Sequence, residues 1–110
     1  MRAVARGERP APPDAAEMSF NSVEALARLL TRQNRDLLAT IRDRKPQSIA
    51  ELAKMTGRAP SNLTRTLDKL EAAGLLRMEL VDRRKVPVPG VRRIYVEIDP
   101  FSTDDRVTAG

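Results

Sequence analysis

The sequence contains no histidine, no cysteine and no tryptophan, and it has only one tyrosine and two phenylalanines among its 110 residues. Without His or Cys, the chain lacks an imidazole base, a thiolate nucleophile and the usual ligands of zinc, haem and iron–sulfur centres. The absence of Cys also excludes a disulfide framework. We therefore expect a protein that is not an enzyme, with no catalytic residue, no bound metal and no cofactor.

Long apolar runs are also missing. No stretch approaches the roughly 20 apolar residues that a transmembrane helix needs. The first sixteen residues contain three prolines and lack the apolar centre of a signal peptide. We expect a soluble, cytoplasmic protein with no membrane partner, and its length suits a single domain without a deep substrate pocket.

Positive charge is concentrated in one part of the chain. The formal net charge is +5. Residues 58–93 contain nine basic and four acidic side chains, whereas residues 94–110 contain one basic and four acidic side chains. A basic stretch of this kind favours a polyanion as partner.

Capping signals predict the first two helices. Asn21 starts a helix that ends near Leu30, because Glu24 follows at the spacing of a capping box. Thr31 can cap a second helix, which Pro46 ends. Residues 17–20 before these helices have the extended pattern of a short strand.

Two further helices lie close together. Ser48 and Glu51 form a capping box that opens a short third helix, and Gly57 suits its left-handed end. Pro60 suits the first position of a fourth helix, which spans 60–73. One narrow apolar face of this helix consists of Leu63, Leu67 and Leu70.

The hydrophobic period changes after Gly74. Alternation over 76–81 and again over 94–98 predicts two half-buried strands of a hairpin, with residues 82–91 as its basic tip, or wing. Pro87 and Pro89 are two residues apart, so their missing amide hydrogens lie on one side, which cannot pair in a sheet.

These elements predict an α+β fold, mainly α: a winged helix-turn-helix with about four helices followed by a β-hairpin wing. We divide the chain into a flexible N-terminal arm (1–16), the winged helix-turn-helix domain (17–99) and a polar C-terminal tail (100–110). The second helix of a helix-turn-helix enters the major groove of DNA.

The face opposite the leucines carries hydroxyl, amide and cationic groups, which read base edges and phosphates. Arg65 can form two hydrogen bonds with a guanine, and Asn62 can do so with an adenine. Three successive cations in the wing suit a flanking groove or phosphate backbone. The predicted DNA-binding residues are Arg58, Ser61, Asn62, Thr64, Arg65, Lys69, Arg83, Arg84 and Lys85.

Each of these residues also has a simpler interpretation. Surface helices commonly carry Arg, Lys and Ser without binding anything, and charged hairpin tips keep a hairpin soluble. Arg93, with its neighbour Arg92, either contacts DNA or pairs across the strands with Glu79. The cluster of Arg42, Arg44 and Lys45 suits the negative end of a helix dipole.

The run SIAELAKMTGRAPSNLTRTLDKLEAAGLL, residues 48–76, resembles the helix-turn-helix core of MarR-like winged-helix transcriptional regulators. Residues 20–98 are similar to small prokaryotic DNA-binding proteins of that group. The residues that carry the resemblance are Glu51, Leu52, Ala53, Gly57, Asn62, Leu63, Arg65, Leu67, Leu70, Glu71, Gly74 and Leu75.

The resemblance implies that the helix through Ser61, Asn62 and Arg65 is the recognition helix, and that residues 83–85 belong to the wing. The sequence departs from the family pattern at Ala59, where such proteins commonly place a Ser or Thr cap. The long ligand-binding and dimerising helices of full-sized MarR regulators are also missing.

The resulting hypothesis is a sequence-specific transcriptional regulator, a repressor that binds double-stranded DNA as a homodimer on an inverted repeat. The expected dimer interface is the first helix with residues 17–20. An alternative is an antitoxin-type interaction module that holds a cognate toxin with a terminal segment and binds DNA secondarily. A nuclease would need carboxylates such as Asp36 and Asp43, but two Asp among Arg residues are common on a solvated helix face.

Overall fold

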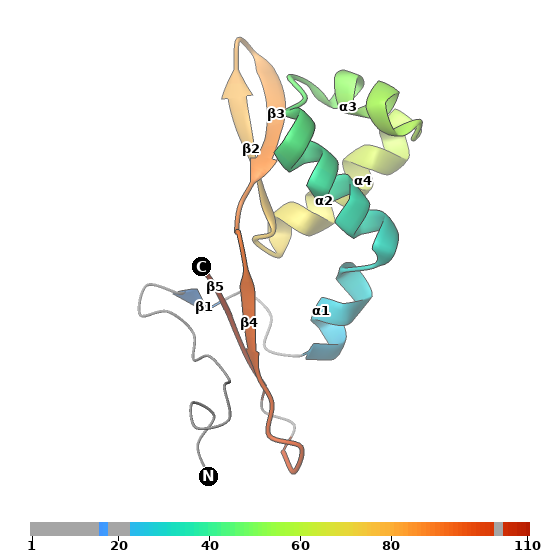
Figure 1. Cartoon of the computed structure of the whole chain (residues 1–110). Helices are drawn as coiled ribbons and strands as arrows, with labels where there is room; N and C mark the ends of the chain where they lie inside the picture. Colours follow the sequence, from blue (N-terminus) through green and yellow to red (C-terminus); the bar gives the residue numbers. More distant parts are fainter. Residues whose placement is uncertain (1–15, 18–22, 103–104) are drawn as a thin grey trace.

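The computed structural model describes residues 16–17, 23–102 and 105–110 (Figure 1). Its elements are β1 (Ala16–Glu17), α1 (Val23–Leu29), α2 (Arg32–Arg44), α3 (Ile49–Thr56), α4 (Pro60–Ala72), β2 (Leu76–Val81), β3 (Arg84–Pro89), β4 (Ile94–Glu97) and β5 (Arg106–Ala109). The fold is α+β and mainly helical, and its four helices are followed by a β-hairpin wing, as predicted. Within the described ranges, no helix combines the length and apolar character needed to cross a membrane.

Helices α2 and α3 begin at the predicted capping residues, and α3 also ends at one. The Thr31 hydroxyl accepts a hydrogen bond from the Asn34 N–H at 3.1 Å and starts α2. The Ser48 hydroxyl accepts from the Glu51 N–H at 3.0 Å and starts α3. Gly57 has a φ of 71° and ends α3 in the left-handed conformation. The predicted cap Asn21 lies outside the described residues, as does most of the strand expected over 17–20.

The core lies between α2, α3, α4 and the start of β2. The apolar positions that the helical period predicted are buried there, together with the first residue of β2. Its most deeply buried large side chains, each no more than 1% exposed, are Leu37, Ile41, Leu52, Leu63, Leu67, Leu70 and Leu76. This packing fixes which face of α4 turns outward.

The partner of the first predicted strand differs from our prediction. β2 pairs in an antiparallel manner with β3, from Val81 opposite Arg84 to Leu76 opposite Pro89. β4, which we expected as the partner of β2, pairs with β5 in a separate three-stranded sheet of order β1-β5-β4. The wing is therefore the whole β2–β3 hairpin, and only Asp82 and Arg83 form its turn.

Backbone geometry explains why β3 tolerates two prolines. Asp82 and Arg83 have φ values of 50° and 65°, as a two-residue type I′ turn requires. In such a hairpin, the residues flanking the turn form a hydrogen-bonded pair, and every second pair is hydrogen-bonded. Pro87 and Pro89 fall at the intervening positions, so their missing N–H groups lie on the edge away from β2.

The base of the wing is held close to the end of α4. The Gly90 N–H donates to the Leu75 carbonyl oxygen at 3.1 Å. A Cβ at position 90 would lie 2.7 Å from the Gly74 carbonyl oxygen, so only glycine fits at this backbone approach. The wing therefore leaves the helical core at a fixed place.

The predicted polar tail contains an unexpected strand. Residues 106–109 form β5, which lies between β1 and β4, and Val107 is only 2% exposed. This segment pairs with β1 on one side and with β4 on the other, so strand pairing overrides its polar composition. Figure 1 shows this second sheet at the opposite end of the molecule from the turn of the wing.

Candidate nucleic-acid interface

The helix-turn-helix consists of α3, a short turn at 57–59 and α4. Gly57 continues the chain out of α3 while its N–H donates to the Ala53 carbonyl oxygen at 2.8 Å. The Glu51 carboxylate accepts from the Gln47 N–H at 3.2 Å, one residue before the partner that a capping box predicts. The unit is thus built by local contacts that the sequence signals.

The start of α4 is fixed by a contact that the sequence does not signal. Ala59 is the N-cap and offers no side-chain hydrogen bond, as the departure from the family pattern suggested. The Arg58 guanidinium instead donates to the Gln33 carbonyl oxygen of α2 at 2.8 Å. Arg58 is half-buried in this position. Of the predicted DNA-binding residues, Arg58 therefore has a structural partner already.

The outward face of α4 is the one predicted. Leu63, Leu67 and Leu70 point into the core, and five predicted DNA-binding residues on this helix are exposed. They are Ser61, Asn62, Thr64, Arg65 and Lys69. Within the described ranges, none of these five side chains has a hydrogen bond or an ion pair to another protein group. Their polar groups are available to a ligand.

Carboxylates on α4 divide this surface. Asp68 is exposed on the outer side of the helix, as expected. Glu71 lies further along, and its carboxylate accepts from the Met78 N–H at 3.3 Å, which joins α4 to β2. The first two turns of α4 therefore carry the amide and cationic groups, and both carboxylates of the helix lie beyond Arg65, with Asp68 three residues further along.

The wing presents a second group of free cations. Arg83, Arg84 and Lys85 are all exposed, and in the described part of the chain none has an ion pair. Arg83 occupies the left-handed region, which non-glycine residues rarely adopt and which costs a non-glycine residue about 1 kcal/mol. A glycine would relieve this cost, so the arginine at the turn is consistent with a role for its side chain.

Other arginines already have partners. Arg42 donates to Asp43 at 2.7 Å and 3.0 Å, and this hydrogen bond raises the pKa of Arg42 and lowers the pKa of Asp43. Arg77 lies 3.5 Å from Glu79 on the same strand. The predicted pairing of Arg93 with Glu79 is wrong, because β4 is not in the sheet that contains β2.

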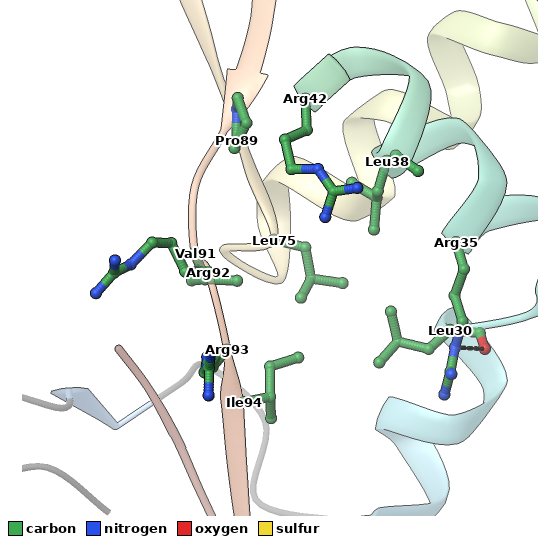
Figure 2. Close-up of a pocket in the computed structure, with 11 residues that line it drawn as sticks. Leu30, Arg35, Leu38, Arg42, Leu75, Pro89, Val91, Arg92, Arg93 and Ile94 are labelled. Carbon is green, nitrogen blue, oxygen red and sulfur yellow. Dashed lines mark hydrogen bonds between the residues drawn. The ribbon is translucent and has the colours of Figure 1, made fainter.

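A groove of about 600 Å³ lies beside α2 (Figure 2). Its apolar lining includes Leu38 and Leu75 from the helical core, and Ile94 from the start of β4. Arg35 and Arg42 lie on its α2 side, and Arg92 and Arg93 lie on the opposite side. Among the residues that the structure describes, no carboxylate lines this groove, which we call the arginine groove.

The described residues contain no group of three or more His, Cys, Asp or Glu side chains that could hold a metal ion. Asp43, one of the two carboxylates weighed for a nuclease, is paired with Arg42. The carbonyl of Gln33 is the functional neighbour that sequence reasoning missed. It meets Arg58 across 25 residues, and no local pattern signals such a contact.

Comparison with known proteins adds one match. A family model described as HVO_A0114 matches residues 29–96, which run from the end of α1 into β4 and include the helix-turn-helix and the wing. No curated protein and no solved structure matches the chain.

Proposed function

The chain belongs to the HVO_A0114 family, and we propose that it is a sequence-specific regulator of transcription that binds double-stranded DNA. The observation that carries this proposal is the set of exposed polar and cationic side chains on α4 and the wing, which have no ion pair within the described ranges. A helix-turn-helix with such a face suits the major groove, and a cationic wing suits the flanking backbone or minor groove.

The proposed division of labour follows from the side chains. Arg65 reads a guanine and Asn62 an adenine, because each can form two hydrogen bonds with that base in the major groove. Ser61, Thr64 and Lys69 contact phosphates or neighbouring bases, and the wing cations contact the backbone. Arg58 acts chiefly by holding the start of α4 against α2. No step of this function requires catalysis, a metal or a cofactor.

We propose a repressor that binds an inverted repeat as a homodimer. One short recognition helix and one wing contact few bases, whereas two copies spaced by one helical turn of DNA double the contacts. The antitoxin-type alternative needs a terminal segment free to hold a toxin. Residues 106–109 instead form β5 in the sheet, and residues 1–15 lie outside the described part of the chain.

Replacing Arg65 by Ala is expected to cost about 1–3 kcal/mol of binding free energy and to relax the preference at one base position. The cause is the loss of two hydrogen bonds to one base. The measurement is a binding titration against the DNA upstream of the protein's own gene, with every single-base variant of the site.

Lys69→Ala is the matched control, because Lys69 lies on the same exposed side of α4 and also has no ion-pair partner among the described residues. This control should weaken binding to all sequences equally, as loss of a phosphate contact does. If Arg65→Ala also weakens binding to all sequences equally, Arg65 does not read a base. If neither variant changes binding, α4 does not contact DNA.

A further inference from the structure

One edge of the second sheet is unpaired in the described part of the chain. β4 pairs with β5 on one side only, and β5 separates it from β1. The Arg93 N–H and carbonyl oxygen both bond Gly110, at 3.2 Å and 3.1 Å. Along an antiparallel strand, the N–H and C=O groups of successive residues point alternately to the two edges. Since Arg93 points towards β5, the backbone groups of Ile94 and Val96 point to the other edge. β4 thus presents free donors and acceptors for another strand.

Apolar side chains accompany this edge. Val96 is 42% exposed, Ile98 is 56% exposed and Phe101 is 96% exposed. Together they contribute three of the five exposed large hydrophobic side chains in the described residues. The other two, Leu80 and Val81, belong to the wing at the far end of the molecule. A cluster of this kind beside an open strand edge is typical of a protein contact.

The charges along the strand identify the partner. Arg92 and Arg93 precede β4, whereas Glu97 ends it and Asp99 follows it. If a second strand of the same sequence ran parallel, like charges would lie side by side. If it runs antiparallel, the basic start of each strand lies beside the acidic end of the other. We propose that β4 pairs antiparallel with β4 of a second copy of this chain, about a twofold axis.

The directions of the backbone groups restrict the register. Since Ile94 and Val96 carry the outward groups, hydrogen-bonded pairs must join even-numbered residues of the two copies. With Val96 on the twofold axis, Ile94 lies opposite Ile98 of the second copy, and Arg93 lies opposite its Asp99. This register matches apolar side chains with apolar ones and a cation with a carboxylate. A register centred on Tyr95 would place Val91 opposite Asp99 and Arg92 opposite Ile98, so it is disfavoured.

The same register brings the arginine groove into the interface. The paired segment of one copy runs alongside Arg93 of the other, which lines the groove, and Phe101 follows in a turn in which the Ser102 N–H donates to the Asp99 carbonyl oxygen at 3.1 Å. Phe101 is the most exposed large apolar side chain in the described residues, and the groove has an apolar lining with cations at its sides. An acidic and apolar segment of a second copy is therefore complementary to it in both charge and hydrophobicity.

This proposed interface differs from the one expected from the sequence. That expectation chose the first helix with residues 17–20 because the other helices and the sheet were expected to be occupied with the core. β4 is instead separate from the wing and has an open edge. The inference rests on the proposed function, which needs two copies on an inverted repeat. The test below measures the molar mass of the chain without DNA, so its result does not depend on DNA binding.

The test is the molar mass of the full-length chain by sedimentation equilibrium at tens of micromolar. The wild-type chain is expected at twice the 12.2 kDa chain mass. Val96→Lys is expected at the single-chain mass, because it places two like charges together at the axis. Val81→Lys is the matched control, since Val81 is 43% exposed in the other sheet, and this variant should remain a dimer.

Charge reversal tests the register. Arg93→Glu and Asp99→Lys should each shift the mass towards the single chain, and the double variant should restore the dimer. In one chain these residues are about 20 Å apart along an extended strand, so restoration requires contact between copies. Asp99 also accepts the Phe101 N–H at 2.9 Å. The double variant lacks that hydrogen bond too, so a return of its mass to that of the dimer would report the charge pairing alone.

A wild-type chain of single mass, or a Val96→Lys variant that remains dimeric with a folded circular dichroism spectrum, would overturn this inference. Failure of the double variant to restore the dimer would overturn the register. If the wild-type chain is monomeric without DNA but still binds an inverted repeat as two copies, the proposed function stands and the inference fails. If the chain forms the expected dimer but has no affinity for DNA, the inference stands and the proposed function fails.

Discussion

The double variant Arg83→Asn, Arg84→Gln is expected to weaken DNA binding about 60-fold at 0.1 M salt. Each phosphate contact adds about 0.9 to the steepness of the plot of log affinity against log salt. One contact therefore strengthens binding about eightfold when the salt falls from 1 M to 0.1 M. Both side chains are exposed and have no ion-pair partner in the described part of the chain. The slope of log affinity against log salt should therefore become shallower by about 1.8.

The substitutions are chosen to keep the hairpin intact. Asn is among the residues that best tolerate the left-handed conformation of position 83. The control is Arg28→Gln, Arg106→Gln, which removes the same charge from α1 and β5. If the control weakens binding and reduces the slope as much as the wing variant does, net charge rather than the wing accounts for the effect.

Leu63→Ala is expected to reduce the free energy of unfolding by about 2–5 kcal/mol, a large part of the stability of a small domain. Leu63 is fully buried in the core, so the substitution leaves a cavity. Alanine is the best helix former, which means that the loss arises from packing and not from helix propensity. The measurement is chemical denaturation followed by circular dichroism.

Leu80→Ala provides the comparison, because Leu80 is 74% exposed on β2. The same atoms are removed there without leaving a cavity, so the change in stability should stay within about 0.5 kcal/mol. Equal effects at the two positions would show that α4 does not pack as described. The outward face of α4, which depends on that packing, would then be in doubt as well.

Local signals in the sequence predicted the helical part of the fold. Thr31, Ser48 and Gly57 each form a cap with residues three or four positions away, so the relevant contacts are visible as short patterns. The 3.6-residue period of the leucines likewise predicted which side of α4 is buried. The exposure of Asn62 and Arg65 follows from that period.

Pairing of strands could not be predicted in the same way, because the partners are distant in the sequence. The turn of Asp82 and Arg83 lacks the glycine that usually marks a two-residue hairpin, and the two prolines argued against a strand at 84–89. β5 has one buried residue, Val107, which is too little for a periodic signal. The contact of Arg58 with Gln33 is equally non-local.

The most direct test of the central claim is the affinity of the wild-type chain for the DNA upstream of its own gene, measured over a range of salt concentrations. We predict tighter binding to this DNA than to a scrambled duplex of equal length. We also predict that log affinity falls linearly with log salt, by about 0.9 for each phosphate contacted. Absence of binding at low salt, or an affinity that does not depend on salt, would contradict the proposal that this protein is a DNA-binding regulator.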